Sequence, residues 1–99
     1  MIGSFKDGPG GELARFYFTG IRGPGIPNQI EKALRRKLSL LDAASCETSL
    51  FVPPGNNYER LRGNLNGWSS IRVSLQWRLI FQWRDGYAYD VYLDPHTYR

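Results

Sequence analysis

Hydrophobic and polar residues alternate over residues 70–83 of this chain. One parity is apolar throughout, and the other is polar except at Ile80. The apolar positions are Ile71, Val73, Leu75, Trp77, Leu79, Phe81 and Trp83, and the polar ones are Arg72, Ser74, Gln76, Arg78 and Gln82. A period of two residues indicates a β-strand with one buried face and one solvated face. We therefore predict one long strand over residues 70–83.

Apolar residues in the first half of the chain recur at helical spacing instead. This spacing predicts a short helix over residues 12–19 and a longer one that ends near Ala44. The apolar stripe of the longer helix is Ile30, Ala33, Leu34, Leu38, Leu41 and Ala44. Asn28 precedes Glu31 by three residues, which predicts a capping box at its start.

Three shorter strands are expected around these elements. The ranges are residues 1–5 at an edge, residues 58–62, and residues 87–94, with a turn over 63–67 and a loop over 46–57. Asparagine, glycine and proline, which favour turns, mark the turn and the loop.

The register of the last hairpin can be argued from parity. A two-residue loop would pair odd-numbered with even-numbered residues, whereas a three-residue loop ending at Gly86 pairs odd with odd. We predict the three-residue loop, because the odd-numbered apolar residues of both strands then share one face. In that register Arg78 lies opposite Tyr92, and Gln76 lies opposite Asp94.

Together these elements predict an α+β fold with a single domain over residues 1–99. Two N-terminal helices pack on one face of a mainly antiparallel sheet that ends in a three-strand meander. The length suffices for one hydrophobic core. The other face of the sheet is then open and lined by arginine, tyrosine and histidine.

Cationic residues concentrate in two places, and the net charge is +4 with a pI near 9.5. The arginines of residues 60–84, a segment without an acidic residue, are Arg60, Arg62, Arg72, Arg78 and Arg84. Guanidinium groups on a solvated strand face suit a polyanion. The second group is Lys32, Arg35, Arg36 and Lys37 on the longer helix. It is either a solvated helix face or a partner contact.

Several classes of function are disfavoured by composition. The single cysteine, Cys46, permits no internal disulfide and is consistent with a reducing cytosol. One cysteine and one histidine cannot form a zinc site, and no phosphate-binding glycine loop follows a strand. No apolar run is long enough to cross a membrane, and residues 1–18 lack the pattern of a signal peptide. We expect a cytoplasmic protein with no metal, no cofactor and no membrane partner.

An ordered set of short motifs runs along nearly the whole chain. They are Met1-Ile2, Ser4-Phe5, Pro53-Pro54-Gly55-Asn56, Leu61-Arg62-Gly63, Gly67 with Ser70-Ile71-Arg72-Val73, Gln76-Trp77-Arg78, Phe81, Trp83, Asp85-Gly86, Ala88, Asp90-Val91, Asp94 and His96. This set resembles the RelE/ParE superfamily of bacterial toxins, specifically its HigB (host inhibition of growth) branch.

The resemblance implies the toxin of a type II toxin-antitoxin system. Such a toxin is a ribosome-dependent endoribonuclease, or mRNA interferase, that cuts the codon in the ribosomal A site and stops translation. It uses the ribose 2′-hydroxyl as nucleophile and no metal. Its partners are the ribosome with its messenger RNA and a helix-turn-helix antitoxin of the HigA type.

The resemblance also implies roles for individual residues. Arg78 matches the phosphate-stabilising arginine, and Arg62 supplies a second cation. Glu59 is a candidate base, although an ion pair with Arg60 or Arg62 would explain it equally well. His96 matches the histidine of the family's terminal Asp-Tyr-His motif.

The end of that motif is altered in this chain. Pro95 stands where the family has its tyrosine, and we expect Tyr98, together with Asp94, to complete the catalytic set. The expected RNA contacts are Arg60, Arg72, Gln76, Tyr92, Lys32, Arg35, Arg36 and Lys37. Trp68, in the turn before the long strand, could stack on a base.

Two other functions stay open on the same fold. One is inhibition of DNA gyrase in the manner of ParE, although chains of that type lack this arginine-rich face with a tail histidine. The other is a non-catalytic RNA- or protein-binding module, which Pro95 and the replacement of a family acid by Asn64 keep possible.

Overall fold

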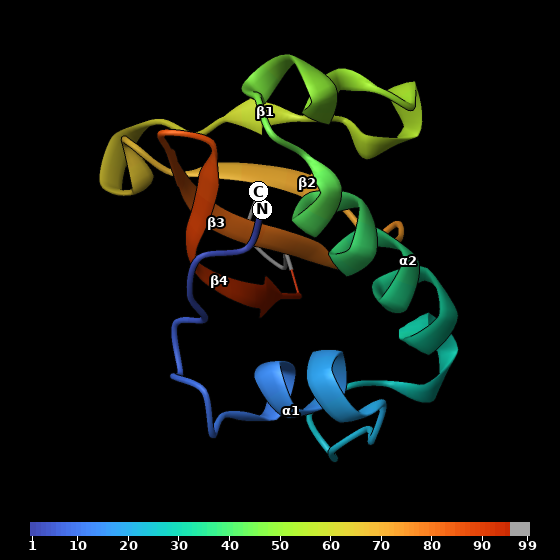
Figure 1. Cartoon of the computed structure of the whole chain (residues 1–99). Coiled ribbons are helices and arrows are strands. Elements are labelled where there is room, and N and C mark those ends of the chain that lie inside the picture. Colours follow the sequence, from blue (N-terminus) through green and yellow to red (C-terminus); the bar gives the residue numbers. More distant parts are fainter. Residues whose placement is uncertain (96–99) are drawn as a thin grey trace.

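The computed structural model describes residues 1–95 and contains two α-helices beside a four-stranded antiparallel sheet (Figure 1). The helices are α1 (Glu12–Thr19) and α2 (Glu31–Ala43), and the strands, in spatial order, are β1 (Glu59–Arg60), β2 (Ser69–Arg72), β3 (Arg78–Arg84) and β4 (Tyr87–Asp94). Short 3-10 helices are η1 (Asn28–Ile30), η2 (Glu47–Phe51), η3 (Pro54–Asn56) and η4 (Gly63–Leu65). The predicted α+β fold is confirmed. Both helices end where the sequence predicted, and β4 covers the predicted range.

The predicted long strand over residues 70–83 is wrong, because the chain reverses within it. The backbone carbonyl of Trp77 accepts hydrogen bonds from the N–H groups of Val73 at 2.8 Å and Ser74 at 3.1 Å. The resulting hairpin pairs Arg72 with Arg78. Because five residues separate this pair, even-numbered residues of β2 lie opposite even-numbered residues of β3. The alternation of apolar and polar residues therefore continues through the turn without a break.

The last hairpin has a two-residue turn at Asp85-Gly86 rather than the predicted three-residue loop. Asp85 has φ 51° and Gly86 has φ 85°, as a type I′ turn requires. Arg84 therefore pairs with Tyr87, and the two strands begin with odd-numbered residues opposite even-numbered ones.

A β-bulge then restores parity further along the same hairpin. Between the pairs Gln82–Tyr89 and Ile80–Tyr92 the register shifts by one residue, next to Asp90 with φ 54°. Beyond the bulge Arg78 lies opposite Asp94, not opposite Tyr92 as predicted.

The N-terminal segment runs parallel to β4 along its outer edge. Isolated bridges pair Ile2 with Ala88 and Phe5 with Val91, in agreement with the edge strand predicted for residues 1–5. The Ser4 hydroxyl oxygen accepts the N–H of Asp90 at 2.9 Å and so supports the bulge from the neighbouring segment.

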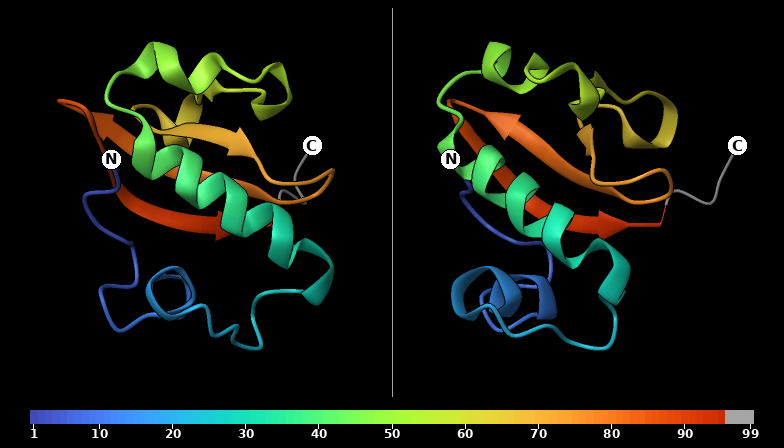
Figure 2. Two further views of the ribbon diagram at one scale, coloured as in Figure 1. Left: turned by 45° about the vertical axis from the view of Figure 1, so that its right-hand side comes forward. Right: turned by 90° about the vertical axis from the view of Figure 1, so that its right-hand side faces the viewer.

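The hydrophobic core lies between α2 and the sheet (Figure 2). Helix α2 crosses one face of the sheet, and α1 lies beside the start of α2 (Figures 1 and 2). The core includes Phe16 of α1, Leu34, Leu38 and Leu41 of α2, and Ile71, Leu79, Phe81 and Val91 of the sheet. Trp77 and Trp83 pack against it, as predicted for their parity.

Three local predictions fail around these elements. Asn28 does not cap α2, because residues 28–30 form η1 and no side chain caps the helix. The loop over residues 46–57 holds η2 and η3, and the strand predicted for residues 58–62 is reduced to β1. No helix within residues 1–95 combines the length and the apolar content needed to cross a membrane.

Candidate functional site

Arg78 lies at the start of β3 on the face of the sheet away from α2. Its neighbour Leu79 is in the core, and successive side chains of a strand point to opposite faces. Although it carries a charge, Arg78 is only 5% exposed. Its Nε donates to the Ser70 hydroxyl at 3.0 Å, and its Nη2 donates to the Asn57 carbonyl at 3.0 Å. The guanidinium is therefore held in one orientation.

Asn57 contacts both Arg78 and Arg72, which lie on the open face. It follows η3 with φ 44° and ψ 49°, the left-handed conformation that asparagine tolerates better than most residues. Its carbonyl accepts from Arg78. With the side-chain oxygen turned toward Arg72, that oxygen accepts from Nε and Nη2 of Arg72, each at 3.2 Å. One residue thus sets the spacing of two cations.

Glu59 of β1 completes the group. Its Oε1 lies 3.6 Å from Nη2 of Arg78, so its ionic partner is Arg78 and not Arg60 or Arg62, the partners considered from the sequence. The Glu59 side chain is 55% exposed, while that of Arg78 is 6% exposed. Asn57, Tyr58, Glu59, Arg72 and Arg78 line a shallow hollow on the open face, which we call the Arg78 hollow. A carboxylate that water can reach thus stands beside a buried guanidinium.

The other two arginines near β1 lie outside the Arg78 hollow. Arg60 faces η2, where its Nε donates to Glu47 Oε2 at 2.7 Å and its Nη2 to Oε1 at 2.5 Å. Hydrogen bonds from Arg60 and Tyr58 hold the pKa of Glu47 below its ordinary value. Arg60 thus lies apart from Arg78, and its predicted contact with RNA stays a prediction. Arg62 precedes η4 and is exposed, and it does not line the hollow.

An aromatic and cationic group lies further along the same face. The Tyr92 ring packs edge-on against Trp68, with centroids 5.7 Å apart, and the Lys6 ammonium lies 4.3 Å from the Tyr92 centroid. Tyr92 pairs with Ile80, two residue pairs along the β-ladder from the pair of Arg78 and Asp94. Gln76 is instead exposed in the turn between β2 and β3, so its predicted place opposite Asp94 is wrong.

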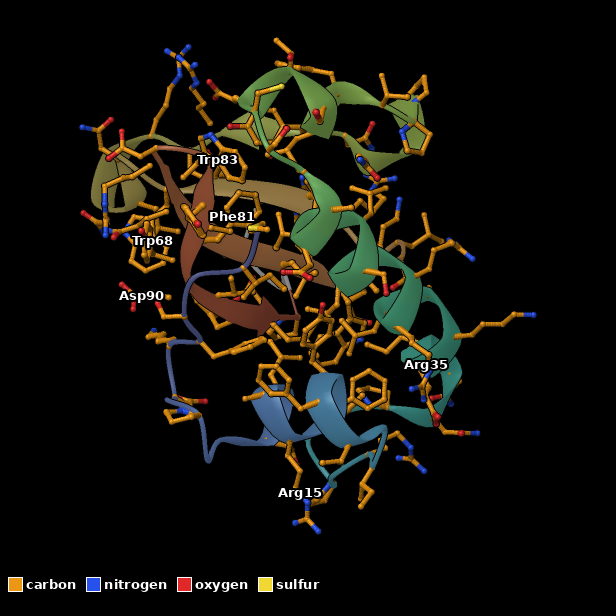
Figure 3. All side chains as sticks on the ribbon, viewed as in Figure 1. Arg15, Arg35, Trp68, Phe81, Trp83 and Asp90 are labelled. Carbon is orange, nitrogen blue, oxygen red and sulfur yellow. The ribbon has the colours of Figure 1, made fainter. Side chains whose placement is uncertain are left out.

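The basic residues of α2 do not join this site. Lys32, Arg35 and Arg36 are exposed on the helix, and Arg35 pairs with Glu31 at 2.9 Å. Figure 3 shows Arg35 on the opposite side of the molecule from Trp68. Lys37 is buried, and its ammonium donates to the side-chain oxygen of Asn56. The ammonium of Lys37 is thus engaged inside the protein, unlike the charged groups of the exposed basic residues of α2.

Two of the predicted catalytic residues, His96 and Tyr98, lie outside the described residues. Asp94 is the last residue of β4 and faces Arg78 across the ladder, so the chain leaves the sheet beside the Arg78 hollow. The sequence reasoning missed Asn57 and Ser70. An asparagine after Pro-Pro-Gly-Asn signals a turn, but its contact with Arg78 depends on how that turn packs.

Comparison with known proteins agrees with this architecture. The family model described as "RelE-like toxin of type II toxin-antitoxin system HigB" matches residues 4–96. The chain is 58% identical over 86 residues to Toxin HigB-1 of Vibrio cholerae, covering 87% of this chain and 90% of that protein. It is 40% identical over 86 residues to an uncharacterized protein of Haemophilus influenzae, covering 87% of this chain and 85% of that one.

The fold and the family match define a RelE-like toxin of a type II toxin-antitoxin system. Within that class the chain belongs to the HigB family. A toxin of a type II system has an antitoxin as its partner.

Proposed function

We propose that this HigB toxin is a ribosome-dependent messenger-RNA endonuclease. The observation that carries the proposal is the Arg78 guanidinium, fixed by Ser70 and Asn57 and paired with the half-exposed carboxylate of Glu59 on the open sheet face. A fixed cation beside a water-accessible carboxylate supplies two of the groups that phosphodiester transfer needs.

The proposed reaction breaks one P–O bond. The ribose 2′-oxygen attacks the neighbouring phosphorus, the bond to the 5′-oxygen breaks, and the products are a 2′,3′-cyclic phosphate and a 5′-hydroxyl. The 2′-hydroxyl loses a proton to a base, and the leaving 5′-oxygen gains one from an acid. The pentacoordinate phosphorane between them carries extra negative charge, which a preorganised cation stabilises.

We propose that Arg78 stabilises the negative charge of the phosphorane. A guanidinium group matches the geometry of a phosphate, and the guanidinium of Arg78 is already oriented by its hydrogen bonds. Arg72, held by the same asparagine, would bind the adjacent phosphate. Glu59 is the proposed base. The proposed acid is His96, the one side chain in the sequence whose ordinary pKa lies near neutrality, with Asp94 and Tyr98 in support.

The openness of the Arg78 hollow supports dependence on the ribosome, because the hollow alone cannot surround an RNA substrate. It is shallow and open, and the sequence contains a single histidine. We propose that the ribosome presents the A-site codon to this face, with exposed cations such as Lys32 and Arg36 on ribosomal RNA. Binding should then weaken steeply as salt rises. The antitoxin would hold the toxin inactive.

The test compares Arg78→Lys with wild type in cleavage of a short message on programmed ribosomes. Lysine keeps the charge but cannot bond Ser70, Asn57 and a phosphate in the same fixed plane. We expect cleavage to fall about a hundredfold, the scale for loss of one oriented transition-state donor. Arg78→Ala should be inactive as well and should also lower the unfolding temperature, because the arginine is buried.

Arg15→Lys is the matched control, since Arg15 is exposed on α1, far from the sheet face (Figure 3). It should cleave like wild type. Equal cleavage by Arg78→Lys would contradict the role of Arg78. Equal rates on free and ribosome-bound message would contradict ribosome dependence, and blocked DNA supercoiling without RNA cleavage would favour the gyrase alternative.

A further inference from the structure

Lys37 is a charged residue in an unusual place. It lies on α2 with only 7% exposure, and its ammonium bonds the side-chain oxygen of Asn56. Within residues 1–95 the ammonium has no carboxylate within ion-pair distance. Burial, with the nearby cation of Arg36, lowers its pKa. A buried cation that bonds only neutral oxygen costs stability, whereas an apolar side chain of similar length would not.

Asn56, the partner of Lys37, is fully buried and uses every polar atom of its side chain. Its amide nitrogen donates to the carbonyls of Leu50 and Val52, each at 3.1 Å. Its oxygen accepts from Lys37. An asparagine amide offers one acceptor oxygen and two donor hydrogens, and here all are engaged. The orientation of Asn56 is therefore determined jointly by α2 and by the end of η2.

The next residue is the one that holds the arginines. Asn57 turns into the left-handed conformation directly after Asn56 and presents its carbonyl to Arg78 at 3.0 Å. Because the two asparagines share a peptide bond, a rotation of Asn56 moves the Asn57 carbonyl. Contacts on the α2 side of the molecule are thereby connected to a guanidinium on the open face.

We propose that Lys37 is a positioning residue for RNA cleavage, acting through Asn56 and Asn57 on the Arg78 guanidinium. This inference rests on the proposed function, and it adds a residue remote from the RNA to the site. Lys37 fixes Asn56, Asn56 fixes the turn at Asn57, and that turn fixes Arg78. The charge on Lys37 matters because a charge-assisted hydrogen bond is about twice as strong as a neutral one.

The experiment uses Lys37→Met, which keeps most of the length and removes the donor. The direct readout is exchange of the Arg78 Nε–H with solvent, followed by nitrogen-15 NMR, because that hydrogen is bonded to Ser70. We expect at least fivefold faster exchange. In single-turnover cleavage on ribosomes we expect the maximal rate to fall about tenfold to a hundredfold, the scale of a small misplacement. The message concentration for half-maximal rate should stay unchanged.

Leu13→Ala is the control for a merely structural effect, since Leu13 is a core residue of α1, which lies at the opposite end of the molecule from η3 (Figure 1). It should lower the unfolding temperature at least as much and leave the Arg78 signal and the cleavage rate unchanged. In the Arg78→Lys background, Lys37→Met should cause no further loss of rate. A further loss as large as in wild type would overturn the proposal.

Unchanged exchange of the Arg78 hydrogen in Lys37→Met would overturn it too, as would equal acceleration in Leu13→Ala. Absence of ribosome-dependent cleavage by the wild-type protein would contradict the proposed function alone. The exchange measurement would then still decide whether Lys37 positions Arg78, so the two failures are distinguishable.

Discussion

At the scale of single residues, the two buried cations, Arg78 and Lys37, are held mainly by neutral oxygen atoms. Arg78 bonds a hydroxyl and a carbonyl and has Glu59 only at 3.6 Å, while Lys37 bonds an amide oxygen. Partners of this kind hold a cation in place without neutralising it. We therefore expect Arg78 to attract a phosphate despite the nearby carboxylate of Glu59.

Cys46 provides a test of local hydrogen bonding at this scale. The thiol is exposed and lies 3.2 Å from the Thr48 hydroxyl and 3.3 Å from that of Ser49. Hydrogen bonds from Ser49 and Thr48 favour the thiolate and lower the pKa of Cys46 to about 7. The rate of alkylation by iodoacetamide should therefore be half-maximal near pH 7, against about 8.5 for an unperturbed cysteine.

The control is Ser49→Ala, which removes the hydroxyl that contributes most to this shift. Its alkylation profile should move toward higher pH. A wild-type profile centred near pH 8.5 would show that the thiolate is not stabilised.

At the scale of elements, the bulge in β4 decides which residues face the Arg78 hollow. Without the extra residue near Asp90, the two-residue turn would place an odd-numbered residue, Leu93, opposite Arg78. With it, Asp94 takes that position, and both Ala88 and Val91 are buried despite their opposite parity. The bulge thus reconciles a tight turn with one continuous apolar face.

We predict that the conformation of Asp90 limits what this position accepts. Its φ of 54° is strained for a β-branched side chain, so Asp90→Val should lower the free energy of unfolding by about 1–2 kcal/mol. Asp90→Gly should be nearly neutral, since glycine adopts this conformation freely. Urea unfolding of both variants checks this, and equal destabilisation by glycine and valine would contradict it.

At the scale of the whole molecule, Asp42 of α2 joins three separate segments. Its carboxylate accepts the N–H of Ile2 at 2.9 Å, which attaches the N-terminal segment. It also accepts the hydroxyl of Tyr17 on α1. The N-terminal edge segment and both helices therefore meet at one carboxylate.

This junction predicts a loss of stability at alkaline pH. Burial, with the hydrogen bond to Asp42, raises the pKa of Tyr17 to about 12 from 10.0. Between these values the unfolded chain has lost the proton and the folded chain keeps it, so stability is full below pH 10 and decreases as pH rises toward 12. A shift of about two pKa units corresponds to about 2.8 kcal/mol at about 1.4 kcal/mol per unit, and most of it should be lost by pH 12.

Tyr17→Phe removes the titrating group. The variant should be less stable than wild type at pH 8, but its free energy of unfolding should change less with pH above pH 10. Urea unfolding of both proteins between pH 8 and pH 11.5 measures the difference. Parallel curves would show that Tyr17 does not cause the alkaline loss.

Features that depend on local periodicity and composition could be predicted from the amino-acid sequence. Helical spacing marked α1 and the end of α2, alternation marked the range of β4, and the ordered motifs indicated the HigB family. The arginine at position 78 was singled out by its place on the polar parity of a strand. These signals are local, because a few neighbouring residues decide whether a segment favours helix or strand and which of its side chains face the core.

The pairing of those elements, and which charged groups meet, follow from the folded packing of the chain and could not be predicted. Odd and even numbering shows only which face of the sheet a residue occupies. The turn over 73–77 contains five residues and therefore does not interrupt the alternation. The bulge at Asp90 shifts the register by one residue and so cancels the change of parity that the two-residue turn introduces. Packing of η2 and η3 around α2 buried Lys37 and turned Arg60 toward Glu47. It also brought Asn57 to Arg78, a contact across 21 positions in sequence that no local pattern encodes.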